Sequence, residues 1–240
     1  MTEPTRLAKR VVALTHCSRR EAEQYIEGGW VRVDGQVVEK PQFMLDAQTV
    51  QIDPAATLAP AQAITLVLHK PQGYTTDDGP NPASALVTPE SHTSDDASGV
   101  RLLQRHMLHL TELLPLPVQA SGLLIFSQDW RVRRNLGENG ERVEQEFVVE
   151  VDGPLSADNL DLLNHGLTIN HYALPPIKVS WQSERRLRFA FKRLQPGQIE
   201  PMCQAVGLQV LSVKRLRVGR IPLARLAPGQ WRYLAPHERV

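Results

Sequence analysis

Residues 6–38 read RLAKRVVALTHCSRREAEQYIEGGWVRVDGQVV and carry the local signals that decide the first part of the fold. Apolar residues recur at helical spacing over residues 5–16, which predicts a helix with one buried face. Ser18 is a favoured N-cap, and Glu21, three residues later, completes a capping box that begins a second helix. Gly28 is expected to end that helix. The chain therefore opens with two short helices.

An extended segment follows these helices. Valines recur over residues 31–38 around an Asp34-Gly35 pair, which favours a β-hairpin turn. Residues 48–53 alternate in hydrophobicity and predict a third short strand. Residues 1–53 are therefore expected to form a small module of two helices and a β-hairpin.

Basic residues gather at the start of this module, where the first twenty positions contain a single acid, Glu3. They are Arg6, Lys9, Arg10, Arg19 and Arg20. Arg19 and Arg20 begin the second helix, and the free backbone N–H groups of a helix N-terminus attract phosphate. A solvated basic face is the alternative interpretation, and charge by itself does not decide between the two.

Residues 5–38 closely resemble the S-four RNA-binding domain, which is named after a ribosomal protein. The matching marks are R-L-x-x in the first helix, S-R-R-E-A at the start of the second, I-x-x-G at its end and V-x-V-D-G in the hairpin. Asp34 stands where asparagine is more usual, and both residues suit the turn. The resemblance implies recognition of structured RNA through shape and phosphates. The expected contacts are Arg6, Lys9, Arg10, Ser18, Arg19 and Arg20.

A second domain is expected after a linker over residues 54–63, PAATLAPAQA. In the remaining residues, 64–240, strands and helices interleave without the regular alternation of a parallel doubly wound sheet, so we predict an α+β domain. Strands are predicted at 64–71, 122–128, 146–153, 186–192 and 208–219, and helices at 130–138, 159–167 and 198–207. Residues 75–99 have the composition of a long polar loop.

The second domain resembles the RsuA/RluF group of ribosomal RNA pseudouridine synthases over most of its length. LVLHKPQGY (66–74) is similar to the first motif of that family, and SGLLIFSQD (121–129) to the strand after its catalytic loop. AVGLQVLSVKRLRVGRIPLARLAPGQWRYL (205–234) is similar to its C-terminal signature. The resemblance implies a mixed, largely antiparallel sheet and ribosomal RNA as the partner.

Three positions depart from the family pattern where its chemistry takes place. In the family, an aspartate in a G-R-L-D-x-x-T-S-G-L-L stretch attacks the target uridine or its sugar. Counting back from Ser121 in this chain, the position of that aspartate is occupied by Pro117. The family tyrosine, whose hydroxyl is used in proton transfer, is Phe147 here. The arginine of its Q-V-R-R-M helix, which keeps the aspartate ionised, is Glu200. No catalytic residue is therefore expected at these positions.

Three functional hypotheses remain open. The first is a non-catalytic protein that binds structured ribosomal RNA. The second is an active uridine isomerase with a relocated carboxylate, for which Asp77 and Asp78 in the polar loop are the candidates. The third is a protein-interaction scaffold that no longer binds RNA, although the retained basic residues of the first module argue against it.

The last predicted strand is also basic, and residues 211–225 contain no acid. Alternation along a two-sided strand would put Arg215 and Arg217 on one face. The expected RNA contacts of the second domain are Lys70, Lys214, Arg215, Arg217 and Arg220. Exposed charges that discourage strand pairing are the structural alternative.

The amino-acid composition narrows the classes of protein to which the chain can belong. A net charge of +1, with 42% hydrophobic and 22% charged residues, is ordinary for a globular protein. The chain has neither the apolar core of a signal peptide nor a run of about 18 apolar residues, so we expect a cytoplasmic protein with no membrane partner. Cys17 and Cys203 lack metal-binding spacing, so neither metal nor cofactor is expected, and nothing indicates an oligomeric state. Trp130, Trp181 and Trp231 are expected in the core or at turns.

Overall fold

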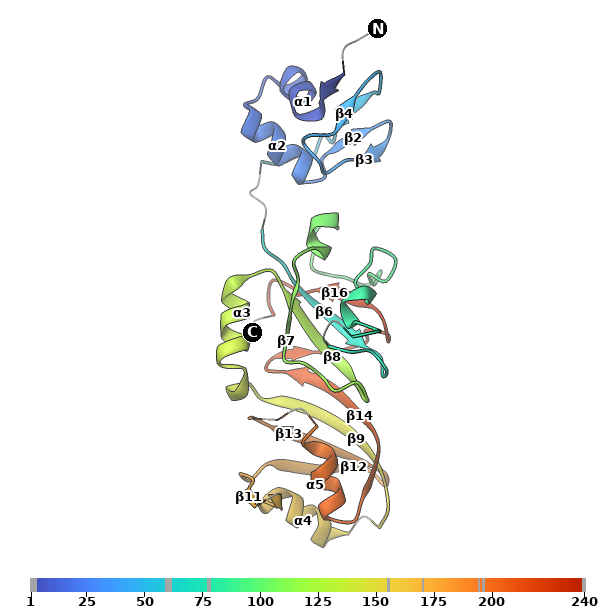
Figure 1. Ribbon diagram of the computed structural model, residues 1–240, viewed down its shortest axis with the longest axis vertical. Helices are drawn as coiled ribbons and strands as arrows, with labels where there is room; N and C mark the ends of the chain where they lie inside the picture. Colours follow the sequence, from blue (N-terminus) through green and yellow to red (C-terminus); the bar gives the residue numbers. More distant parts are fainter. Residues whose placement is uncertain are drawn as a thin grey trace. The chain divides into compact units, whose positions relative to one another are not determined.

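The chain divides into two compact units, traced in Figure 1. The first unit comprises residues 1–63 and 101–108, and the second comprises 64–100 and 109–240. The computed structural model describes residues 4–58, 62–76, 79–154, 156–169, 171–193, 195 and 197–238. Residues 101–108, which the sequence placed in the second domain, thus pack with the first unit.

The first unit contains the two predicted helices, α1 (Leu7–Thr15) and α2 (Arg19–Glu27). The capping box of α2 is present, because the Glu21 N–H donates to the Ser18 hydroxyl at 3.3 Å and the Ser18 N–H donates to the Glu21 carboxylate at 2.7 Å. Both helices bury apolar residues against the short strands of the unit. These strands are β1 (Thr5–Arg6), β2 (Val31–Val33), β3 (Gln36–Val37), β4 (Met44–Leu45) and β5 (Val50–Ile52).

The hairpin turn between β2 and β3 has the conformation that its sequence favours. Asp34 and Gly35 both have positive φ, 48° and 83°, as a two-residue turn of the primed type requires. Strand β5 pairs with the other edge of β2. Strands β1 and β4, which pair with each other, were not predicted, because two-residue strands leave no periodicity to detect.

Residues 101–108 complete the first unit. The buried Leu103 side chain sits against Gly29, where a Cβ would lie 2.6 Å from a methyl carbon of Leu103. Arg101 donates to the Asp53 carboxylate at 3.2 Å and lies 4.2 Å from the centre of the Trp30 ring. Glycine at position 29 is therefore required by this close approach as well as by its positive φ of 68°.

The second unit is built on a mixed, largely antiparallel sheet, as the sequence predicted. Within the described residues the strand order is β12-β13-β9-β14-β8-β6-β16, and β15 and β7 pair with β14 and β8. The pair β14–β8 is parallel. The bounds are β6 (Thr65–Lys70), β7 (Thr111–Leu113), β8 (Ala120–Ser127), β9 (Gln145–Asp152), β12 (Lys178–Ser183), β13 (Arg186–Phe191), β14 (Gln209–Val218), β15 (Ile221–Pro222) and β16 (Trp231–Tyr233). Strands β7, β12, β15 and β16 were not predicted.

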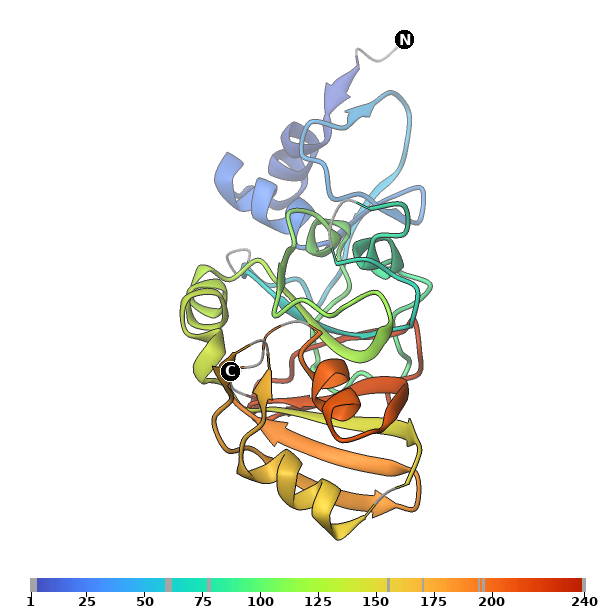
Figure 2. The same cartoon turned by 60° about the horizontal axis from the view of Figure 1, so that its bottom comes forward.

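Helices cover this sheet at two places. Helices α4 (Ala157–His165) and α5 (Ile199–Ala205) lie on one face of the end formed by β12, β13 and β9, as Figures 1 and 2 show. Helix α3 (Trp130–Glu138) packs beside β7 and β8. Short 3-10 turns at Ala83–Leu86, Gln104–Met107 and Gly140–Arg142 and a small hairpin of β10 (Thr168–Ile169) and β11 (Tyr172–Ala173) complete the elements. Within the described residues no helix is long and apolar enough to cross a bilayer.

A β-bulge in β14 overturns one sequence-based expectation. Arg215 pairs with Phe147, but Arg217 pairs with Glu146, and these two partners are consecutive residues of β9. Consecutive residues of a strand point to opposite faces, so Arg215 and Arg217 lie on opposite faces of the sheet. The prediction of a single arginine-bearing face was wrong because the bulge between the two arginines reverses the alternation.

Candidate functional site

A cavity of about 390 Å³ in the second unit brings together residues that lie far apart in the sequence. Its walls come from residues 114–120, from strands β9 and β14, and from the first turn of α5. Pro117, Phe147 and Glu200, the three positions that depart from the family pattern, all line it, and so does Arg215. The positions at which the family chemistry was expected therefore do meet in one place.

The loop that carries Pro117 is fixed from beneath by Lys70. The Lys70 ammonium donates to the carbonyl oxygens of Ala120 at 2.7 Å and Pro117 at 3.2 Å, and the Gly73 N–H donates to Val118 at 2.8 Å. Lys70 is fully buried, and this burial lowers its pKa to about 8. The expectation that Lys70 contacts RNA does not fit this geometry, because its charge is enclosed and satisfied by backbone carbonyls.

Arg215 is a buried cation in the cavity wall. Its guanidinium donates to the Leu123 carbonyl at 2.7 Å, to the Gln145 side-chain oxygen at 2.9 Å and to the Leu114 carbonyl at 2.7 Å. Burial lowers the pKa of Arg215, and the charge of Glu112 opposes this shift. Arg215 is only 1% exposed, so it cannot reach RNA that passes over the surface of the sheet. Sequence reasoning also missed that an arginine still lines the cavity.

Phe147 and Glu200 differ sharply in exposure. Phe147 is almost completely buried, and its ring centre lies 6.2 Å from that of Phe191. Glu200, in the first turn of α5, is exposed and is the one acid among the described residues that line the cavity. Asp77 and Asp78, the candidate replacement carboxylates, lie outside the described residues.

The other basic residues of the last long strand do not form one surface. Arg217 is paired with Glu144 at 2.6 Å and with Glu146 at 3.0 Å, and Glu146 also accepts from Arg188 at 2.7 Å. Burial raises the pKa of Glu146, but the bonds from Arg188 and Arg217 outweigh it and hold that pKa below its usual value. Lys214 is half-buried, and Arg220 is the exposed residue of the set predicted in the second domain.

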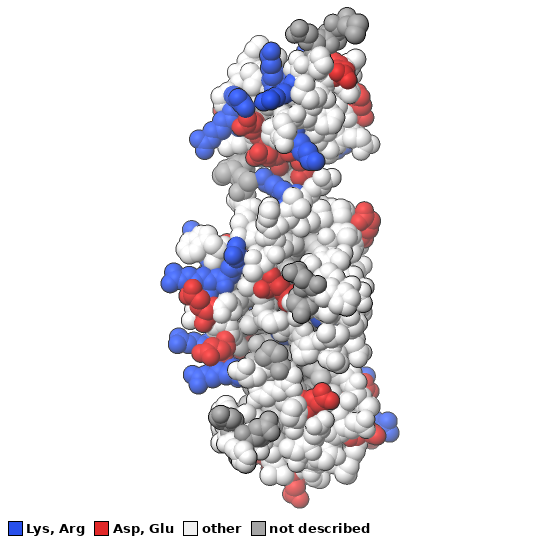
Figure 3. All heavy atoms as spheres, in the orientation of Figure 1, with Lys and Arg blue, Asp and Glu red and all other residues white. Residues whose placement is uncertain are grey.

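The basic residues of the first unit remain at its surface, and Figure 3 shows basic side chains over this unit. Arg6, Lys9 and Arg19 line one shallow depression, in which Arg19 is also paired with Glu23 at 3.0 Å. Arg10 and Arg20 are exposed outside it. The Ser18 hydroxyl accepts from the Glu21 N–H, so its observed role is to cap α2.

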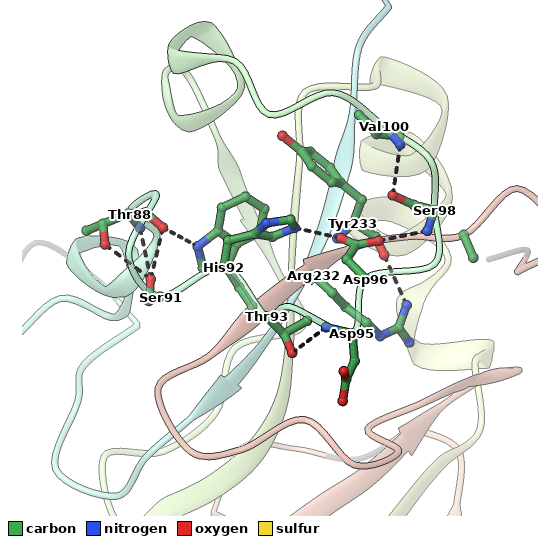
Figure 4. Close-up of polar contacts among 12 residues, drawn as sticks. Thr88, Ser91, His92, Thr93, Asp95, Asp96, Ser98, Val100, Arg232 and Tyr233 are labelled. Carbon is green, nitrogen blue, oxygen red and sulfur yellow. Dashed lines mark hydrogen bonds and ion pairs between the residues drawn. The ribbon is translucent and has the colours of Figure 1, made fainter.

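The polar loop over residues 75–99 is anchored on β16 by a cluster that the sequence did not reveal (Figure 4). The His92 imidazole contacts the Asp96 carboxylate at 2.7 Å, and Asp96 accepts from the Tyr233 N–H at 2.8 Å. The His92 ring centre lies 4.5 Å from that of Trp231. Backbone bonds from Thr93 to Trp231 and from Trp231 to Ser91 continue this pairing. None of the described residues of this loop lines the cavity.

The two units and the cavity define a class of protein in which an N-terminal S4-type module precedes a pseudouridine synthase fold. Residues 5–50 match the family described as S4 domain. A solved structure described as pseudouridylate synthase aligns over 96% of both chains with a TM-score of 0.61 and 17% identity, which shows a shared fold.

The curated relatives are similar along almost the whole chain. The ribosomal small subunit pseudouridine synthase A of Pseudomonas aeruginosa is 28% identical over 97% of this chain and 98% of its own length. An uncharacterized RNA pseudouridine synthase of Aquifex aeolicus is 27% identical over 97% and 94%. The dual-specificity RNA pseudouridine synthase RluF of Escherichia coli is 24% identical over 98% and 77%. The chain is a homologue of the RsuA- and RluF-type ribosomal RNA pseudouridine synthases and carries their S4 domain.

Proposed function

We propose that this protein binds structured ribosomal RNA and leaves the uridines of that RNA unmodified. The observation that carries the proposal is the position of Pro117. It lines the cavity where the family resemblance expects the attacking aspartate, and its side chain offers no oxygen. The loop around it is held by hydrogen bonds from Lys70 to the carbonyls of Pro117 and Ala120.

The other two changes support the same conclusion. Phe147 supplies a ring without the hydroxyl that the family uses in proton transfer, and no described residue adds an acid to the cavity wall besides Glu200. Glu200 is exposed on α5, at the place where the family resemblance expects an arginine and not a nucleophile.

RNA binding is supported by the first unit. An S4 domain spans residues 5–50, and the relatives along the whole chain are named for action on RNA. Arg6, Lys9 and Arg19 line one depression, which offers three cations to a phosphate backbone. A scaffold that binds only proteins would have no use for this arrangement.

The test uses the purified full-length protein and transcripts of both ribosomal RNAs. Binding is measured by filter retention, and pseudouridine, which has the same mass as uridine, is measured by chromatographic separation of the two nucleosides after incubation with excess RNA. We expect binding without product. Multiple-turnover isomerisation would overturn the proposal, and the variants Glu200→Gln and Asp77→Asn/Asp78→Asn would then locate the carboxylate responsible.

A further inference from the structure

Helix α3 presents an unusual outer surface. Trp130, which was expected in the core or at a turn, is the first residue of this helix and is 63% exposed. Arg131, Arg133 and Arg134 are all exposed as well. Helix α3 thus presents a large aromatic ring together with three arginines at the surface of the second unit.

The spacing on the helix groups these residues. Leu136 and Val132 turn toward the sheet and join the apolar cluster there. One stripe of the helix faces outward and begins at Trp130. It continues three, four and seven positions later with Arg133, Arg134 and Gly137, and we call it the Trp130 stripe. A Cβ placed on Gly137 would meet nothing within 4 Å, so the stripe ends on open surface. In Figure 3, basic side chains, interspersed with acidic ones, lie along the flank where Figure 1 draws α3.

Most of the charge on this surface is available to a ligand. Neither Arg131 nor Arg133 is ion-paired with an acid in the part of the chain that the structure describes. Arg134 contacts Glu138 at 3.2 Å, but both side chains are about two-thirds exposed, and such pairs are weak and readily exchanged. The Arg131 guanidinium lies 5.7 Å from the centre of the Trp130 ring and can stack there or turn outward.

We infer that α3 is a second RNA-binding surface, on which an unpaired base stacks on Trp130 while Arg131 and Arg133 hold the flanking phosphates. This inference rests on the proposed RNA-binding function and adds a contact surface to it. Indole rings accept every base on their faces, and arginine guanidinium groups match phosphate geometry. Both features suit single-stranded RNA, in which the bases are free to leave their stack.

A protein partner fits this surface less well. Protein interfaces surround an anchoring tryptophan with further apolar residues. Among the described residues of α3, Trp130 is the one large apolar side chain that is exposed, and its neighbours on the stripe are two arginines and a glycine.

The test compares matched variants of the full-length protein on a ribosomal RNA fragment that the wild type binds. Trp130→Ala should weaken binding roughly 5- to 150-fold, and Trp130→Phe should retain most of the affinity because it keeps a stacking ring. Trp181→Ala is the matched control. Trp181 is 51% exposed on β12, but its neighbour on β13 is Leu187, and Arg188 on β13 pairs with Ser180 and so lies on the other face.

A second part of the experiment tests whether the arginine charges of α3 contact phosphates. Arg131→Ala together with Arg133→Ala should lower the slope of log affinity against log salt by about 0.7 for each phosphate that the variant no longer neutralises. If the wild type binds the RNA and the Trp130→Ala and Trp181→Ala variants bind it with equal affinity, the inference that α3 binds RNA is wrong. The proposed RNA-binding function of the protein would not be affected. Absence of wild-type binding to any ribosomal RNA fragment would overturn both. Since Trp130 is exposed, thermal melts of each variant should match the wild type.

Discussion

The side-chain oxygen of Gln145 accepts a hydrogen bond from the Arg215 guanidinium at 2.9 Å, in the wall of the cavity that Pro117 also lines. The other acceptors of this guanidinium are the backbone carbonyls of Leu123 and Leu114. These hydrogen bonds are all to neutral groups, and the charge of Glu112 favours the Arg215 cation from a greater distance. Arg215 therefore places a positive charge in the same cavity wall as position 117.

This relationship changes what an aspartate at position 117 is expected to do. On sequence alone, its nearest charged neighbour would be Glu200, and repulsion would keep it protonated. With Arg215 in the same wall, the new carboxylate should be ionised, and the missing hydroxyl at Phe147 becomes the remaining defect. Pro117→Asp alone should give no turnover, and Pro117→Asp/Phe147→Tyr should give slow but detectable isomerisation of bound RNA.

The isomerisation activity of each variant is measured as single-turnover release of tritium from labelled uridine in the bound RNA. Pro117→Asn/Phe147→Tyr is the control, because it has nearly the same shape without the charge. Turnover by Pro117→Asp alone would show that the hydroxyl is dispensable, and a silent double variant would show that a further group is missing.

Lys70 leads to a prediction about stability. Lys70→Met leaves the carbonyls of Pro117 and Ala120 buried without their charged donor, and each such loss costs about 1–3 kcal/mol. Urea unfolding should therefore show a loss of about 2–6 kcal/mol for the two carbonyls, with the salt dependence of RNA binding unchanged. Lys178→Met, at an exposed position on β12, is the control and should stay within about 0.5 kcal/mol. A flatter salt dependence for Lys70→Met would instead restore the phosphate contact expected from the sequence.

The parts of the fold that the sequence predicted are those with local causes. The capping box needs only Ser18 and Glu21, and the primed turn needs only Asp34 and Gly35. The helix over 130–138 likewise follows from its own residues.

The missed features depend on contacts distant in sequence. The Lys70 side chain is buried because it donates to backbone carbonyls about fifty positions later in the sequence. The Arg215 and Arg217 side chains lie on opposite faces of the sheet because a β-bulge in β14 reverses the alternation of side chains between them. Residues 101–108 join the first unit through Leu103 and Arg101, whose partners lie before residue 54. The number and spacing of basic residues in the sequence do not reveal which of them are buried, and Lys70 and Arg215, both expected to contact RNA, are buried in the structure.

His106 makes the stability of the first unit depend on pH. Burial, helped by the charge of Arg105, lowers the pKa of His106 from 6.5 to about 4. The folded imidazole thus stays neutral where the unfolded one takes up a proton. The stabilising effect is complete above about pH 6.5, falls as pH drops through the interval between the two pKa values, and is lost by about pH 4, a total of about 3 kcal/mol.

Hydrogen exchange of the first-unit amides at several pH values measures this effect. His106→Gln should remove most of the pH dependence between pH 4 and 6.5, and His109→Gln, at an exposed position three residues later, is the control for removal of a histidine. An equal pH dependence in His106→Gln and the wild type would assign the effect to other groups.

The position of the depression in the first unit predicts which basic side chains contact RNA. Lys9 and Arg19 line it together, whereas Arg10 and Arg20 are exposed but lie outside it. A phosphate seated in the depression would contact the first pair and reach the second pair only through solvent, where salt screens the attraction. Lys9→Ala/Arg19→Ala should therefore lower the slope of log affinity against log salt by about 0.7–0.9 for each phosphate left without its cation, and Arg10→Ala/Arg20→Ala should lower it less. Both double variants remove the same total charge, so their difference isolates position from net charge. Equal changes would mean that a diffuse positive field attracts the RNA, and no change in either would show these residues to be a solvated face.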